Sequence, residues 1–281
     1  MKNRSSTLAG QVAANVIEVL IGGKRSLIVL FVVAIFSVAT NLISGGVDKY
    51  LPAWAGLILG VLLFLFILAL VYFGIRHIAS AMKIRVLQDD NPPTCKVLIL
   101  FLSPVGGDRT TAENITRGAI PATIENPGDR QRFKASWRMP LEAIAHHMTR
   151  LEKVIVVPSA DSPGKTDGTY RDLDLFVGTV KKMCGDHAPQ LLSPNDLGLN
   201  CQDGVDFETA EALVSVLERI YARLREKGYP DYEILIDITG GQKVPTVAGA
   251  TVALDVGRRI QYVSLRDYRV RVYDFSVSSS K

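Results

Sequence analysis

Residues 237–243, with the sequence Asp-Ile-Thr-Gly-Gly-Gln-Lys, combine residue types that can hold an anion. An apolar run ending at Ile238 leads into them, and small residues at helical spacing follow from about Val244. A strand, a glycine turn and a helix N-terminus in this order leave backbone N–H groups unpaired and direct a positive dipole end at one point. Because the ammonium group of Lys243 lies beside this turn in the sequence, the segment predicts a site for a phosphate or another anion.

Two further loops are expected to meet this turn. The apolar run 96–102 predicts a buried strand that delivers a glycine-containing loop and opens a polar stretch to about Trp137, and the strand 154–157 delivers a second polar loop. Ligands of open α/β sheets bind outside the carboxyl ends of the strands, so the three loops should converge there. The predicted ligand-binding residues are Ser103, Pro104, Gly106, Gly107, Asp161, Thr239, Gly240, Gly241, Gln242 and Lys243.

Structural roles compete with binding roles at the same positions. Asp237 lies late in its strand and could be a base or a metal ligand, or it could hold the following turn through backbone N–H groups. Thr239 could equally cap the next helix. A Gly-Gly pair after a strand is by itself usually only a turn, so the prediction depends on Lys243 and on the two other loops.

Several familiar chemistries are excluded by spacing. The run 164–166, Gly-Lys-Thr, is not a P-loop because Ser159 stands where the motif needs glycine, and no GxGxxG follows the first strand. The three cysteines form no CxxC pair, which is typical of reduced thiols and gives no zinc site. The adjacent His146 and His147 are expected at the surface or its boundary. We therefore predict no catalytic residues, no metal and no cofactor.

The elements that must position these loops alternate between strands and helices from residue 96 onward. This order predicts an α/β fold with a mostly parallel sheet and helices on both faces. A helix containing Leu141 is expected to have Pro140 in its first turn, and a later helix is expected to have Asp206 as its N-cap. Strands are predicted near 96–102, 154–157, 190–192, 233–238, 260–265 and 270–275, the last two as a hairpin.

The N-terminal third predicts a membrane anchor. Residues 26–44 and 51–75 contain no charged residue, and each stretch is long enough to cross a hydrocarbon core of roughly 30 Å as a helix. The short connection between them requires an antiparallel hairpin. We predict four regions: an N-terminal segment 1–25, a transmembrane hairpin 26–75, a linker 76–94 and a ligand-binding domain 95–281.

The basic residues predict how the hairpin is oriented. The first 90 residues carry 8 Lys and Arg against 4 Asp and Glu, and this excess accounts for the net charge of +4. The basic residues flank the hairpin, and its connecting loop holds only Lys49, so the positive-inside rule puts both termini in the cytoplasm. Since the remaining chain is electrically balanced, we expect no binding of DNA or long RNA.

The segment 237–243 resembles the D-x-T-G-G-x-K signature of CARF domains, the cyclic oligoadenylate sensors of type III CRISPR systems. The strand ending in Leu102-Ser103-Pro104 is similar to their first ligand loop, and the resemblance covers roughly residues 95–281. It implies a Rossmann-like domain that dimerises and binds a cyclic oligoadenylate across the dimer cleft. The hairpin stands where such proteins carry an effector domain, which resembles membrane-bound CARF effectors, although two spans depart from the single-span arrangement of that group.

The resemblance implies a membrane-anchored sensor of antiviral defence in the cell inner membrane. A cyclic oligoadenylate, the tetramer being the first candidate, would bind the cytoplasmic domain, and the hairpins would open or assemble a pore in a dimer or larger homo-oligomer. One alternative is a membrane-tethered ring nuclease in which Ser103, Thr239 and Lys243 position the ligand for metal-free cleavage. Another is a receptor for a different nucleotide that signals to a partner protein.

Overall fold

The structure, a computed structural model, describes residues 82–162, 164, 167–240, 243–255 and 257–279, together with Leu62, Leu65, Phe66 and Ala69. The chain divides into two compact units, one of residues 1–4 and 86–276 and the other of residues 5–85 and 277–281. The predicted segment 1–25 and the predicted spans 26–44 and 51–75 lie outside the described residues, apart from those four positions. No helix within the described part of the chain is long and apolar enough to cross a membrane.

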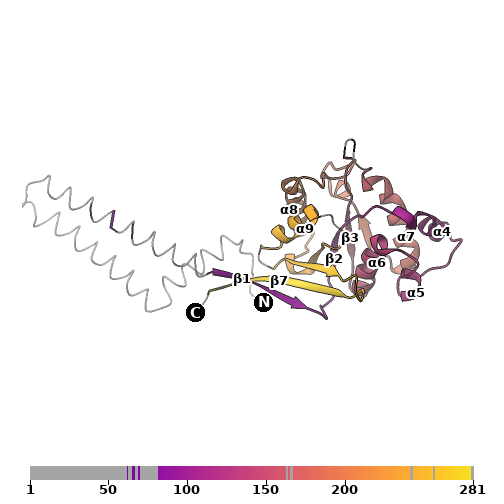
Figure 1. The fold of residues 1–281 in the computed structure, drawn as a ribbon, viewed down its shortest axis with the longest axis horizontal. Helices are drawn as coiled ribbons and strands as arrows, with labels where there is room; N and C mark the ends of the chain where they lie inside the picture. Colours follow the sequence, from indigo (N-terminus) through magenta and orange to yellow (C-terminus); the bar gives the residue numbers. More distant parts are fainter. Residues whose placement is uncertain are drawn as a thin grey trace, which may run out of the picture. The chain divides into compact units, whose positions relative to one another are not determined.

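One seven-stranded sheet has the order β1-β7-β6-β5-β2-β3-β4 (Figure 1). Strands β2 to β6 pair in parallel, and β7 runs antiparallel to β6, as the predicted C-terminal hairpin requires. The strands are β1 (Met82–Asp89), β2 (Val97–Phe101), β3 (Lys153–Val157), β4 (Gln190–Leu192), β5 (Ile234–Asp237), β6 (Arg259–Val263) and β7 (Val270–Ser279). The mostly parallel, Rossmann-like sheet confirms the predicted α/β class.

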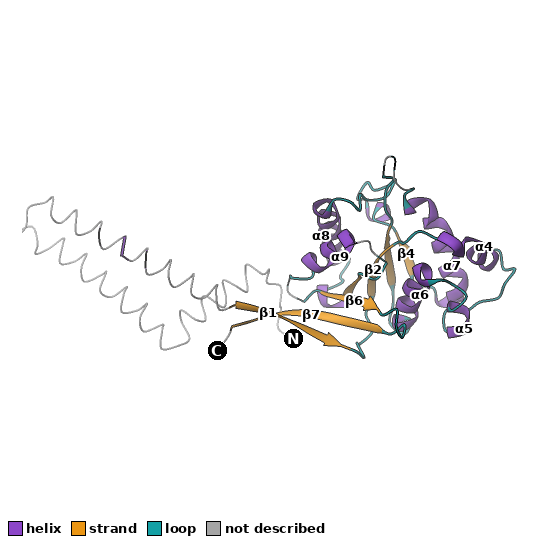
Figure 2. Cartoon of the chain, in the orientation of Figure 1, coloured by secondary structure: helices purple, strands orange, loops and turns teal. Residues whose placement is uncertain are grey.

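Helices cover both faces of the sheet (Figure 2). One face carries α4 (Arg109–Thr116), α6 (Ala135–His147) and α7 (Leu173–Cys184), and the other carries α8 (Ala210–Glu226) and α9 (Lys243–Val252). Each face of the sheet has its own hydrophobic core. Along β2, Leu98 and Leu100 pack into the core beneath α4, α6 and α7, whereas Val97, Ile99 and Phe101 pack into the core beneath α8 and α9. A strand buried on both faces must be apolar at every position, which explains the uninterrupted run.

Three sequence-based boundaries are wrong. Pro140 lies inside α6 instead of in its first turn, because the helix begins at Ala135. Asp206 is not the N-cap of α8: the helix begins at Ala210 with Thr209 as its N-cap, and the Asp206 carboxylate accepts hydrogen bonds from Glu208 N and the Thr209 hydroxyl. The stretch after β2, predicted as a polar loop to about Trp137, contains α4 and the short α5 (Pro127–Arg130).

The predicted linker 76–94 contains β1, the edge strand of the sheet. The described side chains of β1 from Val86 onward are all exposed. Residues 82–86, Met-Lys-Ile-Arg-Val, alternate between apolar and polar types, which is the pattern typical of a strand, so the sequence held a signal for β1. After β1, residues 90–96 lead into β2, the strand at the centre of the candidate site.

Candidate functional site

The strand order reverses between β2 and β5. From β2 the chain moves outward through β3 to β4, and it then returns to place β5 on the opposite side of β2. The loop after β2 leads to α4 on one face, whereas the loop after β5 leads to α9 on the other. In open α/β sheets the ligand crevice lies at such a switch point, outside the carboxyl ends of the strands. The loops that carry Ser103 and Gly240 leave the sheet here.

Ser103 and Gly240 join these two loops directly. The Ser103 hydroxyl donates a hydrogen bond of 2.7 Å to the carbonyl oxygen of Gly240. A β-carbon on Gly240 would lie 2.4 Å from the carbonyl oxygen of Phe101, so only glycine allows this approach. None of the described residues accepts the Gly240 N–H. The predicted meeting of the first and third loops is therefore confirmed at Ser103 and Gly240.

Asp237 and Thr239 fix the Thr239–Gly240 turn to the end of the sheet. The Asp237 carboxylate accepts hydrogen bonds from Thr239 N at 2.7 Å and from the Gln261 amide at 2.8 Å. The Thr239 hydroxyl accepts a hydrogen bond of 2.7 Å from Val263 N. Asp237 is 2% exposed, and burial raises its pKa while the bonds from Thr239 and Gln261 oppose that rise. Of the two roles open for Asp237, the geometry matches the structural one, and the Thr239 hydroxyl is engaged by β6 through Val263 N.

The predicted residues of the first loop form an exposed edge. Pro104, Gly106 and Gly107 are exposed, and Gly106 has φ +53°, a conformation that favours glycine. The ammonium group of Lys134 lies 2.9 Å from where a β-carbon on Gly107 would be. Lys134 immediately precedes α6 and was not predicted as a site residue, since no local pattern links it to a glycine 27 positions earlier. It adds a cation to this loop.

Two carboxylates fix the first loop. Asp108 is 2% exposed, and one of its oxygens accepts a hydrogen bond of 2.9 Å from Lys134 N, whereas the other has no partner among the described residues. Asp172 accepts from Val105 N at 3.1 Å and from the Arg109 guanidinium at 2.5 Å. These contacts tie the loop to α6 and α7 and hold the glycines in a defined place.

Asp161 closes its own loop. Its carboxylate accepts hydrogen bonds from Gly168 N at 2.6 Å and from Arg171 at 2.7 Å. These bonds, the one from Gly168 first, lower the pKa of Asp161. The same loop is packed tightly, because β-carbons on Gly168 and Gly204 would lie 2.5 Å from backbone atoms of Ala160 and Ser159. Asp161 is thus engaged within the chain and offers a ligand no unpaired charge.

Lys243 is the first residue of α9 and is exposed. The first backbone N–H groups of a helix have no partner within it, so an exposed cation at this end reinforces the dipole. Gly249, further along α9, packs against Ile236 and Ile238, which fixes the helix on the sheet. The predicted residues Gly241 and Gln242 lie outside the described residues.

The two adjacent histidines have different environments. His146 is half-buried at the boundary, as expected, and its Nε2 lies 3.1 Å from the Pro92 carbonyl oxygen. His147 is 0% exposed, which contradicts the predicted surface position. Burial lowers the pKa of His147 to about 4. A buried histidine must satisfy both ring nitrogens within the protein.

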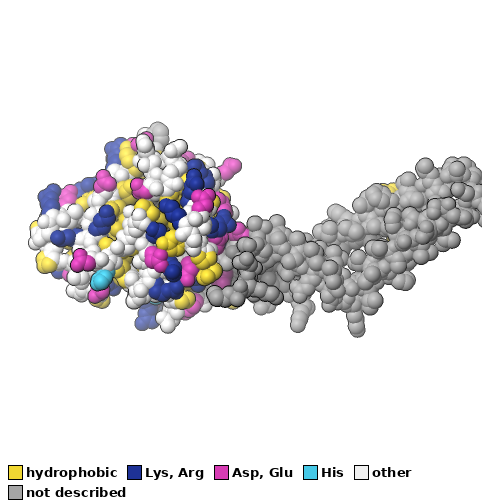
Figure 3. All heavy atoms as spheres, turned by 180° about the vertical axis from the view of Figure 1, so that it is seen from behind, with side chains coloured by type: hydrophobic (Ala, Val, Ile, Leu, Met, Phe, Trp, Pro, Cys, Tyr) yellow, Lys and Arg dark blue, Asp and Glu magenta, His cyan; other side chains and the backbone are white. Residues whose placement is uncertain are grey.

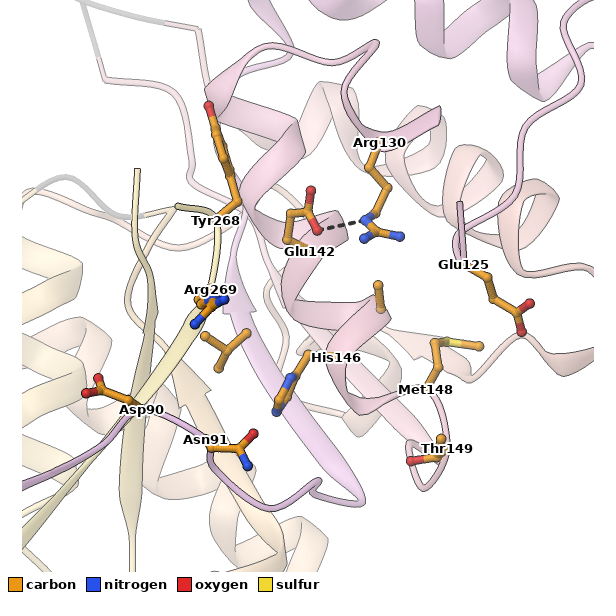
Figure 4. Close-up of a pocket in the computed structure, with 12 residues that line it drawn as sticks. Asp90, Asn91, Glu125, Arg130, Glu142, His146, Met148, Thr149, Tyr268 and Arg269 are labelled. Carbon is orange, nitrogen blue, oxygen red and sulfur yellow. Dashed lines mark hydrogen bonds and ion pairs between the residues drawn. The ribbon is translucent and has the colours of Figure 1, made fainter. Parts of the chain in front are cut away.

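A separate cavity of about 700 Å³ lies beside α6 (Figure 4). Its lining includes Asn91, Arg130, Glu142, His146 and Arg269, and it contains none of the predicted ligand-binding residues. Arg130 and Glu142 point toward one another at 2.8 Å, so these two charges neutralise each other. This cavity is therefore distinct from the two loops at the switch point.

The described residues contain no group of His, Cys, Asp and Glu that could hold a metal ion. On the face that Figure 3 shows, basic and acidic side chains of the described residues are interspersed. At the two loops, Lys134 lies beside Gly107 and Lys243 begins α9.

Comparison with known proteins finds an uncharacterized relative. No family model matches this chain. An uncharacterized protein of Aquifex aeolicus (strain VF5) is 28% identical over 211 residues, which cover 73% of this chain and 64% of that protein. This chain thus spans less than two thirds of that relative's length.

Proposed function

We propose that this chain is a membrane-anchored sensor that binds a cyclic oligoadenylate at the switch-point crevice and acts on the membrane through its N-terminal hairpin. The ligand phosphates would meet the Gly240 N–H, the N-terminus of α9 and the ammonium groups of Lys134 and Lys243. Cyclic tetra-adenylate is the first candidate ring. The proposal follows the resemblance of residues 237–243 to the CARF signature.

One observation carries the ligand part of the proposal. The Ser103–Gly240 hydrogen bond joins the loops after β2 and β5 at the point where the strand order reverses. Phosphates are commonly held at this place by a glycine turn and a helix N-terminus. Gly240 packs closely against the Phe101 carbonyl and is hydrogen-bonded to Ser103, so these contacts fix the position of Gly240 without a ligand.

The membrane part is supported by the uncharged stretches 26–44 and 51–75. Leu62, Leu65 and Phe66 are helical, and between 54% and 60% of each residue is exposed. Large apolar residues exposed in this spacing form one helix face, which water disfavours and lipid or a second helix accepts. Ligand binding would bias the hairpins only by its differential affinity for the two arrangements of the assembly.

Binding of cyclic tetra-adenylate and cyclic hexa-adenylate to the full chain in detergent tests the ligand site. Isothermal titration calorimetry should give binding that Lys243→Ala and Lys134→Ala each weaken by about tenfold or more, because each removes a charge-assisted contact. Lys227→Ala, which removes an exposed lysine after the C-terminal end of α8, is the matched control and should leave the affinity unchanged. Equal affinity in all variants would show that the ligand does not bind at these two lysines.

Dye or ion flux from liposomes containing the full chain tests the effector. Ligand should increase flux from liposomes with the unaltered chain and not from liposomes with Lys243→Ala. Binding without flux would remove the pore and leave the sensor. Chromatography of the ligand after incubation separates the ring-nuclease alternative, since linear products that depend on Lys243 would assign cleavage instead of gating.

A further inference from the structure

A chain of four buried groups runs from the Thr239–Gly240 turn to the start of β2. Gln261 stands opposite Asp237 in the parallel register of β5 and β6, and its amide donates to the Asp237 carboxylate at 2.8 Å. Its amide oxygen lies 2.7 Å from Nε2 of His147. The other ring nitrogen, Nδ1 of His147, accepts a hydrogen bond of 3.2 Å from Cys95 N. This series of hydrogen bonds therefore connects β5, β6, α6 and the segment that enters β2.

The donor and the acceptor of every hydrogen bond in this series are fixed by the two groups at its ends. A backbone N–H can only donate, so Cys95 makes Nδ1 of His147 an acceptor and places the imidazole proton on Nε2. The Nε2–H group then donates to the amide oxygen of Gln261, so the amide NH₂ of Gln261 donates to Asp237. A carboxylate can only accept, so the other end agrees with the first. Reversing any one bond would set two donors against each other.

All four residues are buried: Asp237 is 2% exposed, Cys95 1%, and His147 and Gln261 0%. Buried polar groups are costly unless every donor and acceptor is satisfied, and hydrogen bonds strengthen where water is absent. The same face of the sheet is otherwise packed with apolar side chains against α6, for example Leu235 and Val263. An apolar pair at 147 and 261 would fill this space, so packing alone does not require the polar chain.

We propose that Gln261 and His147 are positioning residues that hold the Thr239–Gly240 turn and link its position to the segment entering β2 at Cys95. Gln261 fixes the second oxygen of Asp237, and Asp237 in turn fixes Thr239 N. His147 carries this constraint across α6 to Cys95, and residues 90–95 connect directly with β1. Displacement of the turn would thus change the hydrogen bonding of Cys95. The part of this inference that concerns a ligand rests on the proposed function.

Hydrogen exchange of the full, ligand-free chain, followed by mass spectrometry, tests the link directly. Gln261→Leu keeps the side-chain volume and removes both amide groups. It should speed amide exchange in the peptide spanning the β5–α9 turn by about tenfold, which corresponds to the loss of a buried hydrogen bond. Met183→Ala, a cavity-forming change in α7, is the stability control and should not accelerate exchange selectively at the turn.

Two substitutions of His147 separate the two halves of the chain. Glutamine can place a donor near Nε2 but no acceptor at Nδ1, so His147→Gln should keep the turn protected and expose the amide of Cys95. Asparagine can place an acceptor near Nδ1 and no donor at Nε2, so His147→Asn should show the opposite pattern. If Gln261→Leu does not fold, the two His147 variants still test whether the turn is linked to Cys95. A uniform rise in exchange in all variants, or no rise at the turn, would overturn the inference.

Cyclic tetra-adenylate provides the second readout. In the unaltered chain it should alter exchange at the turn and also around Cys95, and in His147→Gln only at the turn. Absence of any binding by the unaltered chain would remove the proposed function and leave the ligand-free pattern standing. Binding that depends on Lys243, together with unchanged exchange in the Gln261 and His147 variants, would remove this inference alone.

Discussion

The Ser103 hydroxyl and the Gly240 carbonyl oxygen, 137 positions apart in the chain, are joined by a hydrogen bond of 2.7 Å. This bond closes the edge of the sheet between β2 and β5 and aligns the two loops that leave it. A lysine lies at each loop: Lys134, which precedes α6, lies beside Gly107 of the first loop, and Lys243 begins α9 after the second. Two cations on loops held in a fixed relation can hold two phosphates of one ligand better than two independent loops can.

Gly240→Ala should unfold the chain at a lower temperature. Its β-carbon would meet the Phe101 carbonyl oxygen at 2.4 Å, and backbone cannot move aside, so a loss of about 1–3 kcal/mol is expected for such overpacking. Gly107→Ala is the control, because its β-carbon would meet only the flexible end of Lys134. Circular dichroism melts of both variants check this. A Gly240→Ala protein as stable as Gly107→Ala would contradict the close approach.

Asp237→Asn should destabilise the fold although it removes a buried charge. The new NH₂ group would face the amide NH₂ of Gln261, and two opposed donors in the core lose about 1–3 kcal/mol. Adding Gln261→Glu should restore stability, because its carboxylate accepts from Asn at 237 and from His147. Thermal melts of the two single variants and the double variant form a double-mutant cycle. Purely additive losses would show that the bonds have no fixed direction.

Stability should fall as the pH is lowered from about 6.5 toward 4. The pKa of His147 is lowered to about 4 in the folded chain. Between these pH values the histidine therefore binds a proton in the unfolded chain but not in the folded chain, which favours unfolding. The full effect is on the order of 3 kcal/mol. The raised pKa of Asp237 acts in the opposite direction, because its folded form gains a proton first as the pH falls.

Denaturant titrations at several pH values, with His147→Gln for comparison, isolate the contribution of His147. The variant should lose stability less steeply between pH values of about 6.5 and 4. His187→Gln alters an exposed histidine and should keep the slope of the unaltered chain. Identical slopes in all three proteins would mean that His147 takes up its proton without opening the core.

Arg258→Met should be strongly destabilising. Arg258 is 1% exposed, and its guanidinium contacts Glu218 at 2.6 Å and Asp231 at 3.0 Å. Removing the buried guanidinium leaves the partly buried Asp231 carboxylate and the half-exposed Glu218 carboxylate without this partner, and a loss on the order of 3 kcal/mol is expected. Arg223→Met breaks an exposed pair with Glu226 and should cost less than about 1 kcal/mol. Thermal melts compare the two, and equal losses would contradict the role of burial.

Strongly apolar segments were predictable from the sequence. The run 96–102 became β2 because both faces of that strand are covered, and the Gly-Gly turn after Ile238 is followed by α9 as expected. Elements with few apolar residues were missed. In α4 only Ala112 and Ile115 are buried, and two positions do not establish a helical period.

The sequence by itself determined the alternating strands and helices and the residue types at the switch point, because burial imposes apolar periodicity on neighbouring positions. It left open whether Asp237 faces a ligand or the interior, and it placed His147 at the surface. Only the tertiary structure decided both, since the partners of Asp237 and His147 include Gln261, and Cys95 is 52 positions from His147. Hydrogen bonds between distant segments depend on strand register and helix rotation, and adjacent residues in the chain do not encode these.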